Sequence, residues 1–149
     1  MKVAIVGGGS TYSPELVHGL VGRADALGLS ELVLQDPRED RLGPVGGVCA
    51  RMAATMGSSV AVRTTTSLDE ALDGADFVVV QIRVGGQQGR HEDIRLGLDR
   101  GLIGQETTGV GGLAKALRTI PVVLDIAERV RQRCPDAWLL NFTNPSGMV

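Results

Sequence analysis

Five short apolar segments, separated by helical patterns, run through this chain. They lie at residues 3–6, 31–36, 60–63, 75–81 and 138–142. Residues 3–6 form a continuous apolar run, which is typical of a strand that is covered on both faces. Strands that alternate with helices pair in parallel, through right-handed crossovers. The sequence therefore predicts an α/β fold, a Rossmann-like doubly wound parallel sheet with helices on both faces.

Helices are expected between these strands, and two of them have clear starting signals. Ser13 precedes a proline and a glutamate, so we expect it to cap the first helix, and Ser67 is expected to cap a brief one. Longer helical patterns cover residues 39–56 and 91–100, the second after a glycine-broken stretch at residues 83–89.

A last helix is predicted from apolar residues that recur three and four positions apart. They are Leu113, Leu117, Ile120, Leu124, Ala127 and Val130. This spacing predicts one buried stripe along the helix. Pro121, which lies within the pattern, is expected to bend or break the helix.

Length and composition exclude several classes of protein. Residues 1–149 have the length of one domain. A net charge of −2 argues against a nucleic-acid or anionic-membrane surface. No apolar run reaches the roughly 18–20 residues that span a bilayer. Cys49 and Cys134 lie far apart in helical patterns, so we interpret them as buried free thiols of a cytoplasmic protein.

The first apolar segment leads directly into a glycine turn. The turn consists of Gly7, Gly8, Gly9, Ser10 and Thr11. Such a turn, ahead of a helix, lets backbone N–H groups approach a pyrophosphate at the positive end of that helix. Tyr12 stands where the usual dinucleotide fingerprint has its third glycine, so a tight turn without a ligand is the alternative.

Asp36 ends the second predicted strand, where a carboxylate accepts hydrogen bonds from both hydroxyls of an adenosine ribose. It also repels the 2′-phosphate of NADP, although Arg38 leaves that preference open. A solvated acid in a turn is the alternative interpretation. Together with the glycine turn, Asp36 predicts a dinucleotide site, with NAD as the cofactor.

A second group of polar residues follows the fourth strand. Residues 104–112 place Glu106 and its polar neighbours among four glycines, which a purely structural loop does not require. Arg83 and Arg90 follow the fourth strand at the edge of the sheet where open α/β folds bind ligands, and arginines there fork onto phosphates. A solvated surface role is the alternative for each arginine. His91 is interpreted as a helix-end residue rather than a metal ligand.

The third group, residues 141–145, follows the fifth strand. Asn144 comes just before a proline, where its amide is expected to bind a sugar or hydroxyacid oxygen. The alternative is an asparagine that closes its own turn.

In combination, these segments resemble glycoside hydrolase family 4. The resemblance rests on residues 6–16, 103–109 and 141–147, and it covers the whole chain. The Gly-Gln-Glu-Thr-Thr-Gly sequence at residues 104–109 and the Asn-Pro-Ser-Gly turn at residues 144–147 are most similar to the 6-phospho-β-glucosidase branch. Preference for the anomer and for the hexose stays open at this point.

The resemblance implies an NAD-dependent cleavage of the glycosidic bond rather than the two-carboxylate scheme. NAD⁺ removes a hydride from C3 of the sugar, and a tyrosine base, helped by a divalent metal such as manganese, takes the proton from C2. The C1 leaving group departs, water adds and the hydride returns. A carbonyl that a metal ion polarises stabilises the charge that develops beside it.

The resemblance also implies roles for individual residues. Arg90 and Asn144 match substrate contacts, Arg83 lies on the substrate or cofactor edge, and Glu106 matches the acid that raises the basicity of the tyrosine. The tyrosine, the catalytic aspartate and the metal ligands of the family have no counterpart in residues 1–149. We therefore expect a chain truncated before its second, catalytic domain, which binds NAD but hydrolyses nothing alone.

Two other functions remain open from the sequence. One is a lactate- or malate-type NAD-dependent hydroxyacid dehydrogenase, which shares this kind of cofactor domain and an Asn-Pro turn. The other is a nucleotide-binding or regulatory module without turnover. For the full-length glycosidase, the expected partners are a phosphorylated disaccharide or glucoside and further copies of itself in a homo-oligomer.

Overall fold

A computed structural model describes all residues from 1 to 149 and shows one five-stranded sheet. The strands are β1 (Lys2–Val6), β2 (Glu31–Gln35), β3 (Ala61–Thr65), β4 (Phe77–Val80) and β5 (Trp138–Asn141). All neighbouring strands are parallel, in the order β3-β2-β1-β4-β5. The chain therefore starts in the middle of the sheet and winds to each edge in turn, which confirms the predicted doubly wound α/β fold.

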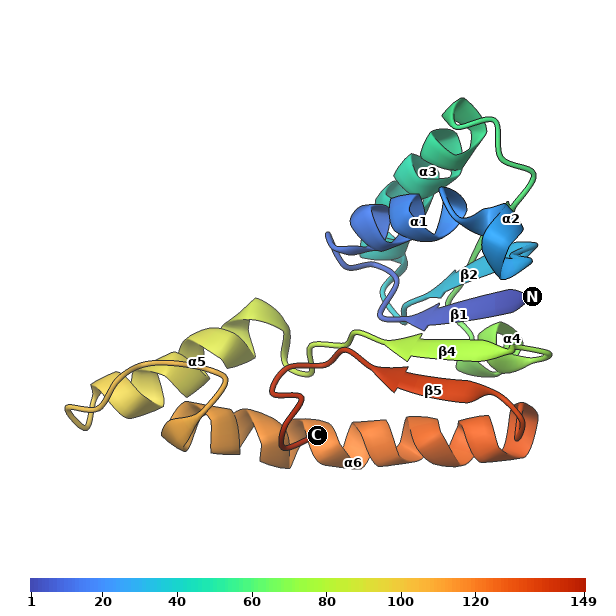
Figure 1. Cartoon of the computed structure of the whole chain (residues 1–149). Coiled ribbons are helices and arrows are strands. Elements are labelled where there is room, and N and C mark those ends of the chain that lie inside the picture. Colours follow the sequence, from blue (N-terminus) through green and yellow to red (C-terminus); the bar gives the residue numbers. More distant parts are fainter.

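The helices lie on both faces of this sheet. They are α1 (Ser13–Val21), α2 (Ala24–Leu27), α3 (Glu39–Thr55), α4 (Leu68–Leu72), α5 (Gly86–Leu98) and α6 (Gly109–Arg133). Figure 1 shows α1 and α3 on one face and α4 and the second half of α6 on the other. The first half of α6 extends past the carboxyl ends of the strands and packs against α5.

Alternation of side chains along β1 divides the core in two. Val3 and Ile5 point into a cluster with the residues of α1 and α3, while Ala4 and Val6 point into a second cluster beneath α4 and α6. Successive residues of a strand face opposite sides of the sheet, so a central strand covered on both sides is apolar throughout. The same physical cause makes β1 recognisable in the sequence.

Two predicted helix starts are wrong. Ser13 does not cap α1, because Tyr12 occupies the capping position and Ser13 lies buried in the first turn. Its hydroxyl accepts a hydrogen bond from Gln81 Nε2 at 2.8 Å instead, which ties α1 to the end of β4. Helix α5 begins at Gly86 rather than at His91, and its glycine-containing first turn lies against Arg118 of α6, where a Cβ on Gly89 would come within 3.2 Å. The prediction for Ser67 is confirmed: its hydroxyl accepts from the N–H of Glu70.

The predicted buried stripe of α6 is wrong for its three leucines, although Val130 is buried as predicted. Leu113, Leu117 and Leu124 are 53%, 66% and 63% exposed. The buried face instead carries small or polar residues, namely Gly111, Gly112, Lys115, Ala116 and Thr119, followed by Ile126 and Val130. Small residues let the backbone of the preceding loop come close, and this approach decides which face turns inward.

Pro121 does not break α6, which continues without interruption to Arg133 (Figure 1). Pro121 is exposed, so its ring lies toward solvent. The N–H that proline lacks costs one intrahelical hydrogen bond, but this loss does not end the helix.

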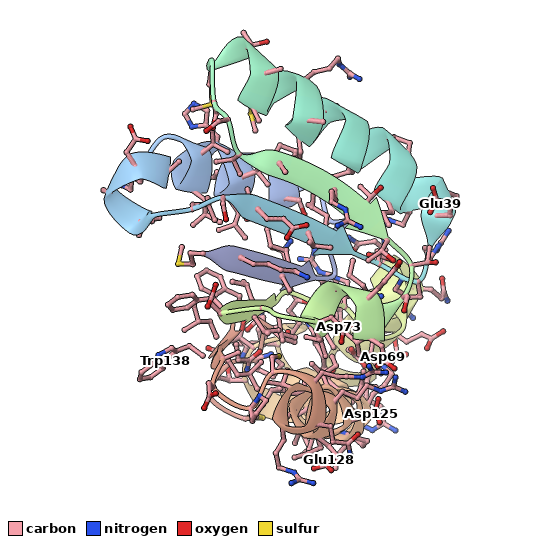
Figure 2. All side chains as sticks on the ribbon, turned by 90° about the vertical axis from the view of Figure 1, so that its right-hand side faces the viewer. Glu39, Asp69, Asp73, Asp125, Glu128 and Trp138 are labelled. Atoms are coloured by element: carbon pink, nitrogen blue, oxygen red, sulfur yellow. The ribbon has the colours of Figure 1, made fainter.

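Ion pairs join α4 to the second half of α6. Arg129 Nη1 lies 3.1 Å from Asp69 Oδ1, and Arg133 Nη2 lies 2.6 Å from Asp69 Oδ2. Figure 2 shows Asp69, Asp73 and Asp125 gathered on this side, while Trp138 of the edge strand β5 points away from the protein. Exposed pairs of this kind contribute little each, and the same two helices also share a buried apolar cluster through Ala71, Leu72 and Ile126.

Two further features of the fold bear on the sequence predictions. Cys49 and Cys134 are both free and buried in the core, as the sequence indicates. None of the helices combines the length and the apolar character that a membrane span requires.

Candidate functional site

A cleft of about 850 Å³ opens at the carboxyl ends of the strands. Its lining includes predicted site residues from five separate parts of the chain. They are Gly7, Ser10, Thr11, Asp36, Arg38, Arg83, Arg90, Glu106 and Asn144. Parallel strands end at one edge of the sheet, so the loops that follow them meet there. Gly8 and Gly9 belong to the same turn but are buried, and they do not line the cleft.

The glycine turn holds β1 and β2 close together. The N–H groups of Gly7 and Gly8 both donate to the carbonyl oxygen of Gln35, at 2.8 and 2.7 Å. A Cβ on Gly8 would lie 2.7 Å from Leu34 Cβ, and Gly7 has a φ of 88°, which favours glycine. The glycines are therefore required by close packing of backbone on backbone.

This packing changes which donors of the turn are available to a ligand. Gly9 N–H donates to Asp36 Oδ2 at 3.2 Å, and Ser10 N–H donates to the Gly7 carbonyl at 3.1 Å. The expected glycine N–H groups are thus already used within the chain. Thr11 N–H makes no hydrogen bond, and it lies just before the start of α1, where the helix dipole favours an anion.

Asp36 is fixed by two backbone N–H groups. Its Oδ2 accepts from Gly9, and its Oδ1 accepts from Arg38 N at 3.0 Å. The Arg38 guanidinium turns to Asp40 instead, with Nε and Nη2 bonding the two carboxylate oxygens at 3.2 and 2.6 Å. The carboxylate of Asp36 is therefore held at the cleft while the charge of Arg38 is engaged elsewhere.

At the other end of the cleft, one carboxylate oxygen of Glu106 forms ion pairs with three cationic side chains. Its Oε2 lies 2.7 Å from Arg83 Nη1, 3.1 Å from Lys115 Nζ and 3.5 Å from Arg90 Nε. The Glu106 side chain is 14% exposed and that of Lys115 only 2%. Three cations around one carboxylate leave this part of the cleft with an excess of positive charge.

The surroundings keep Glu106 ionised. Burial raises the pKa of its carboxyl, but hydrogen bonds from Arg83 and Lys115 outweigh burial and hold that pKa below its usual value. Burial lowers the pKa of Lys115, and the charge of Arg83 adds to this effect, while the hydrogen bond to Glu106 opposes it. The carboxylate is therefore charged at neutral pH.

Arg118 of α6 clamps the segment that carries the two arginines. Its Nη1 and Nη2 bond the buried Asp93 of α5 at 3.1 and 2.6 Å, and its Nε donates to the Val84 carbonyl at 3.1 Å. A Cβ on Gly85 or Gly89 would lie 3.0 or 3.2 Å from the Arg118 guanidinium. The glycines of this stretch thus make room for a guanidinium that fixes the loop after β4.

Two asparagines of the turn after β5 make different hydrogen bonds. Asn141 Oδ1 accepts from Thr143 N at 3.0 Å and so closes the turn. Asn144 does not close its own turn, because its amide donates across to Thr107 Oγ1 at 3.3 Å. This bond joins the turn to the loop that carries Glu106, and it leaves Asn144 on the lining of the cleft.

Sequence reasoning missed Lys115, Arg118 and Gln81. Gln81 bonds Ser13 and also reaches the Gly7 carbonyl at 3.4 Å, so it braces the glycine turn. A lysine within a glycine- and alanine-rich stretch of helix was the available signal for Lys115, but the leucine pattern pointed to the opposite face. His91 is exposed on α5, and no three His, Cys, Asp or Glu side chains of the chain are placed to hold a metal ion.

Comparison with known proteins assigns the family. The profile described as Family 4 glycosyl hydrolase matches residues 2–149. A "Probable 6-phospho-beta-glucosidase" of Bacillus subtilis is 49% identical over 100% of this chain and 34% of its own length. A "6-phospho-alpha-glucosidase 1" of Lacticaseibacillus paracasei is 38% identical over 99% of this chain and 34% of its own length.

A solved structure supports the same assignment. The 6-phospho-beta glucosidase of Thermotoga maritima, with manganese, NAD⁺ and glucose-6-phosphate, is 39% identical and superposes with a TM-score of 0.91. The match covers 99% of this chain and 36% of that one. The chain therefore spans about a third of the length of its relatives. Over that span, this chain belongs to family 4 of the glycosyl hydrolases.

Proposed function

We propose that the full-length protein hydrolyses 6-phospho-β-glucosides with NAD and a divalent metal ion, and that this chain supplies the NAD site and part of the substrate site. One observation carries the proposal: a single cleft joins the glycine turn and Asp36 to the Glu106 cluster. Membership of the family removes the lactate- or malate-type dehydrogenase as the alternative.

The residues at the first end of the cleft fit a dinucleotide. Asp36 is held with both oxygens at the cleft edge, where it would accept the ribose hydroxyls. Thr11 N–H and the start of α1 offer a donor and a favourable dipole to the pyrophosphate. A Cβ on Gly7 or Gly8 would meet backbone atoms of the neighbouring strands, and one on Gly9 would meet the Asp36 carboxylate, so glycine keeps the turn tight beside Asp36. Bound NAD would supply the acceptor and donor of a hydride.

The residues at the second end fit a phosphorylated sugar. Arg83, Arg90 and Lys115 leave an excess of positive charge around Glu106, which favours an anionic substrate. Asn144 adds an amide that bonds hydroxyl oxygens. We propose that the manganese ligands and the tyrosine base belong to the remainder of the full-length enzyme, and manganese as the metal follows the Thermotoga maritima relative.

The β anomer is the better-supported substrate. The chain is more identical to the Bacillus subtilis relative than to the Lacticaseibacillus paracasei one, at 49% against 38%. Purified full-length protein should be assayed on aryl 6-phospho-β-glucosides and 6-phospho-α-glucosides, with and without NAD and manganese. We expect turnover of the β substrate only when both are present. Turnover without NAD would contradict the proposal.

Replacing Asp36 with alanine should weaken NAD binding by about 10- to 100-fold, because charge-assisted hydrogen bonds to the ribose are lost. The wild-type protein should bind NAD more tightly than NADP, and the variant should lose this preference. Calorimetric titration of both dinucleotides measures the two effects. Asp25→Ala, on the exposed helix α2, is the control and should bind like the wild type. A wild-type protein that binds NADP equally well would refute this role for Asp36.

Replacing Arg90 with alanine should lower kcat/KM on phosphorylated glucosides by about 10- to 100-fold, since one cation that faces the substrate anion is removed. Steady-state kinetics of the full-length enzyme measures the loss. Arg95→Ala is the matched control, because Arg95 lies on the same helix and is paired only with Asp99 in solvent. Unchanged kcat/KM in the Arg90 variant would remove Arg90 from the substrate site.

A further inference from the structure

We propose that Lys115 is a positioning residue for Glu106, which holds Oε2 in place so that Oε1 faces the substrate. The substrate part of this inference rests on the function proposed above. Lys115 Nζ makes its one hydrogen bond to Glu106 Oε2, at 3.1 Å. Arg83 and Arg90 approach the same oxygen. Glu106 Oε1 accepts no hydrogen bond from the chain and is not among its fully buried unpartnered atoms, so it is the oxygen left open to the cleft.

Stability alone gives little reason for a lysine at this place. An ammonium has three donors, and the Lys115 side chain, 2% exposed, uses one of them within the chain. Taking a charge out of water is costly, and replacing buried ionic groups by apolar ones of similar volume is often neutral or stabilising. Glu106 would keep Arg83 as a partner without Lys115, so no charge would be left unpaired.

The position of Lys115 explains what the lysine adds. Arg83 comes from the loop after β4 and Arg90 from α5, and both side chains are part exposed. Lys115 comes from α6, at the bottom of the cleft, and is fully buried. It therefore fixes the carboxylate from below, while the arginines stay on the side where the substrate enters. Because the buried Lys115 holds Oε2 of the Glu106 carboxylate in place, the direction of Oε1 is fixed as well.

The first test is the titration of Glu106 in the full-length protein. Lys115→Met keeps the volume and removes the charge, so the pKa of Glu106 should rise. The other charges that face the pair, Arg83 and Arg90, Asp93 and Arg118, are unchanged in this variant. Carbon-13 NMR of labelled glutamate carboxyls, with Glu106→Gln to identify the signal, measures the shift. The melting temperature should stay within about 2 °C of the wild type or rise.

The chain offers a matched control, because Lys2 is its only other lysine. Lys2 Nζ bonds the Asp73 carbonyl at the opposite end of the sheet, so Lys2→Met should leave the pKa of Glu106 unchanged. If Lys115→Met also leaves that pKa unchanged, the inference is wrong. This outcome is independent of turnover, so it decides the role of Lys115 even if the proposed hydrolysis fails in the wild type.

A double-mutant cycle on kcat/KM is the second test. Lys115→Met should lower kcat/KM by about 10- to 100-fold, because a reacting group loses its position. In this variant, the acid limb of the pH profile of kcat/KM should move to higher pH, since the pKa of Glu106 rises. Added to Glu106→Gln, the lysine change should cost nothing more, because both act through one carboxylate. Losses that multiply in the double variant would show that Lys115 acts independently of Glu106 and would overturn the inference.

Discussion

Replacing Gly7 with alanine is expected to abolish NAD binding and to lower the free energy of unfolding by about 2–5 kcal/mol. Two causes add at this position. Gly7 has a φ of 88°, which strains any residue with a Cβ. The new Cβ would also lie 2.6 Å from the carbonyl oxygen and 2.9 Å from the carbonyl carbon of Gln81, which are backbone atoms at the end of β4. Relief of this clash would move β1 and β4 apart beneath the cofactor.

Gly57→Ala separates the two causes. Gly57 has a φ of 68°, and nothing lies within 4 Å of its Cβ position. This control should lose only the cost of the strained φ, about 1–2 kcal/mol, and should bind NAD like the wild type. Urea unfolding and calorimetry measure both variants. Equal losses of stability, or normal NAD binding by the Gly7 variant, would mean that close packing at the turn is not what the glycine provides.

Replacing Glu106 with glutamine is expected to lower kcat/KM of the full-length enzyme by about 100- to 1,000-fold, the usual cost of losing one preorganised electrostatic group. An amide has nearly the shape of the carboxylate, but it does not balance the charges of Arg83, Arg90 and Lys115. The cleft then has three cations without an anion, and the substrate loses a charged acceptor. NAD affinity should change by less than about threefold, because the dinucleotide residues lie at the other end of the cleft.

Glu128→Gln is the matched control for this substitution. Glu128 is an exposed residue of α6, and hydrogen bonds from Arg131 and Gln132 lower its pKa to about 2. It is thus an ionised glutamate that does not line the cleft, and its variant should keep full activity. A melting curve shows whether the Glu106 variant is folded. A folded Glu106→Gln enzyme with more than half of the wild-type kcat/KM would rule out a role for this carboxylate in the reaction.

The strands and the residues at the two ends of the cleft were predictable because their signals are local in the sequence. Residues 3–6 are apolar throughout, since β1 is covered on both faces. Asp36 and the glycine turn follow consecutive strands of a parallel sheet, so their meeting at one edge follows from topology. The residues that the family resemblance selected, Arg90, Glu106 and Asn144, all line the same cleft.

What the sequence did not predict depends on which surfaces meet. The leucine spacing of α6 identified an apolar face, but periodicity does not say what covers that face, and Leu117 is exposed. Lys115 faces inward because the glycines and alanine beside it let the loop of Glu106 approach. Serine is a residue type that often caps helices, but the hydroxyl of Ser13 accepts a hydrogen bond from Gln81, which is distant in sequence. Long-range contacts of this kind leave no local pattern.

A crystal structure of the protein grown with excess NAD tests the central claim most directly. The adenosine ribose should bind Asp36, the pyrophosphate should lie against Thr11 N–H at the start of α1, and the nicotinamide should extend toward Glu106. An empty cleft whose mouth is blocked by Tyr12, or a dinucleotide bound elsewhere, would contradict the assignment of this cleft to NAD.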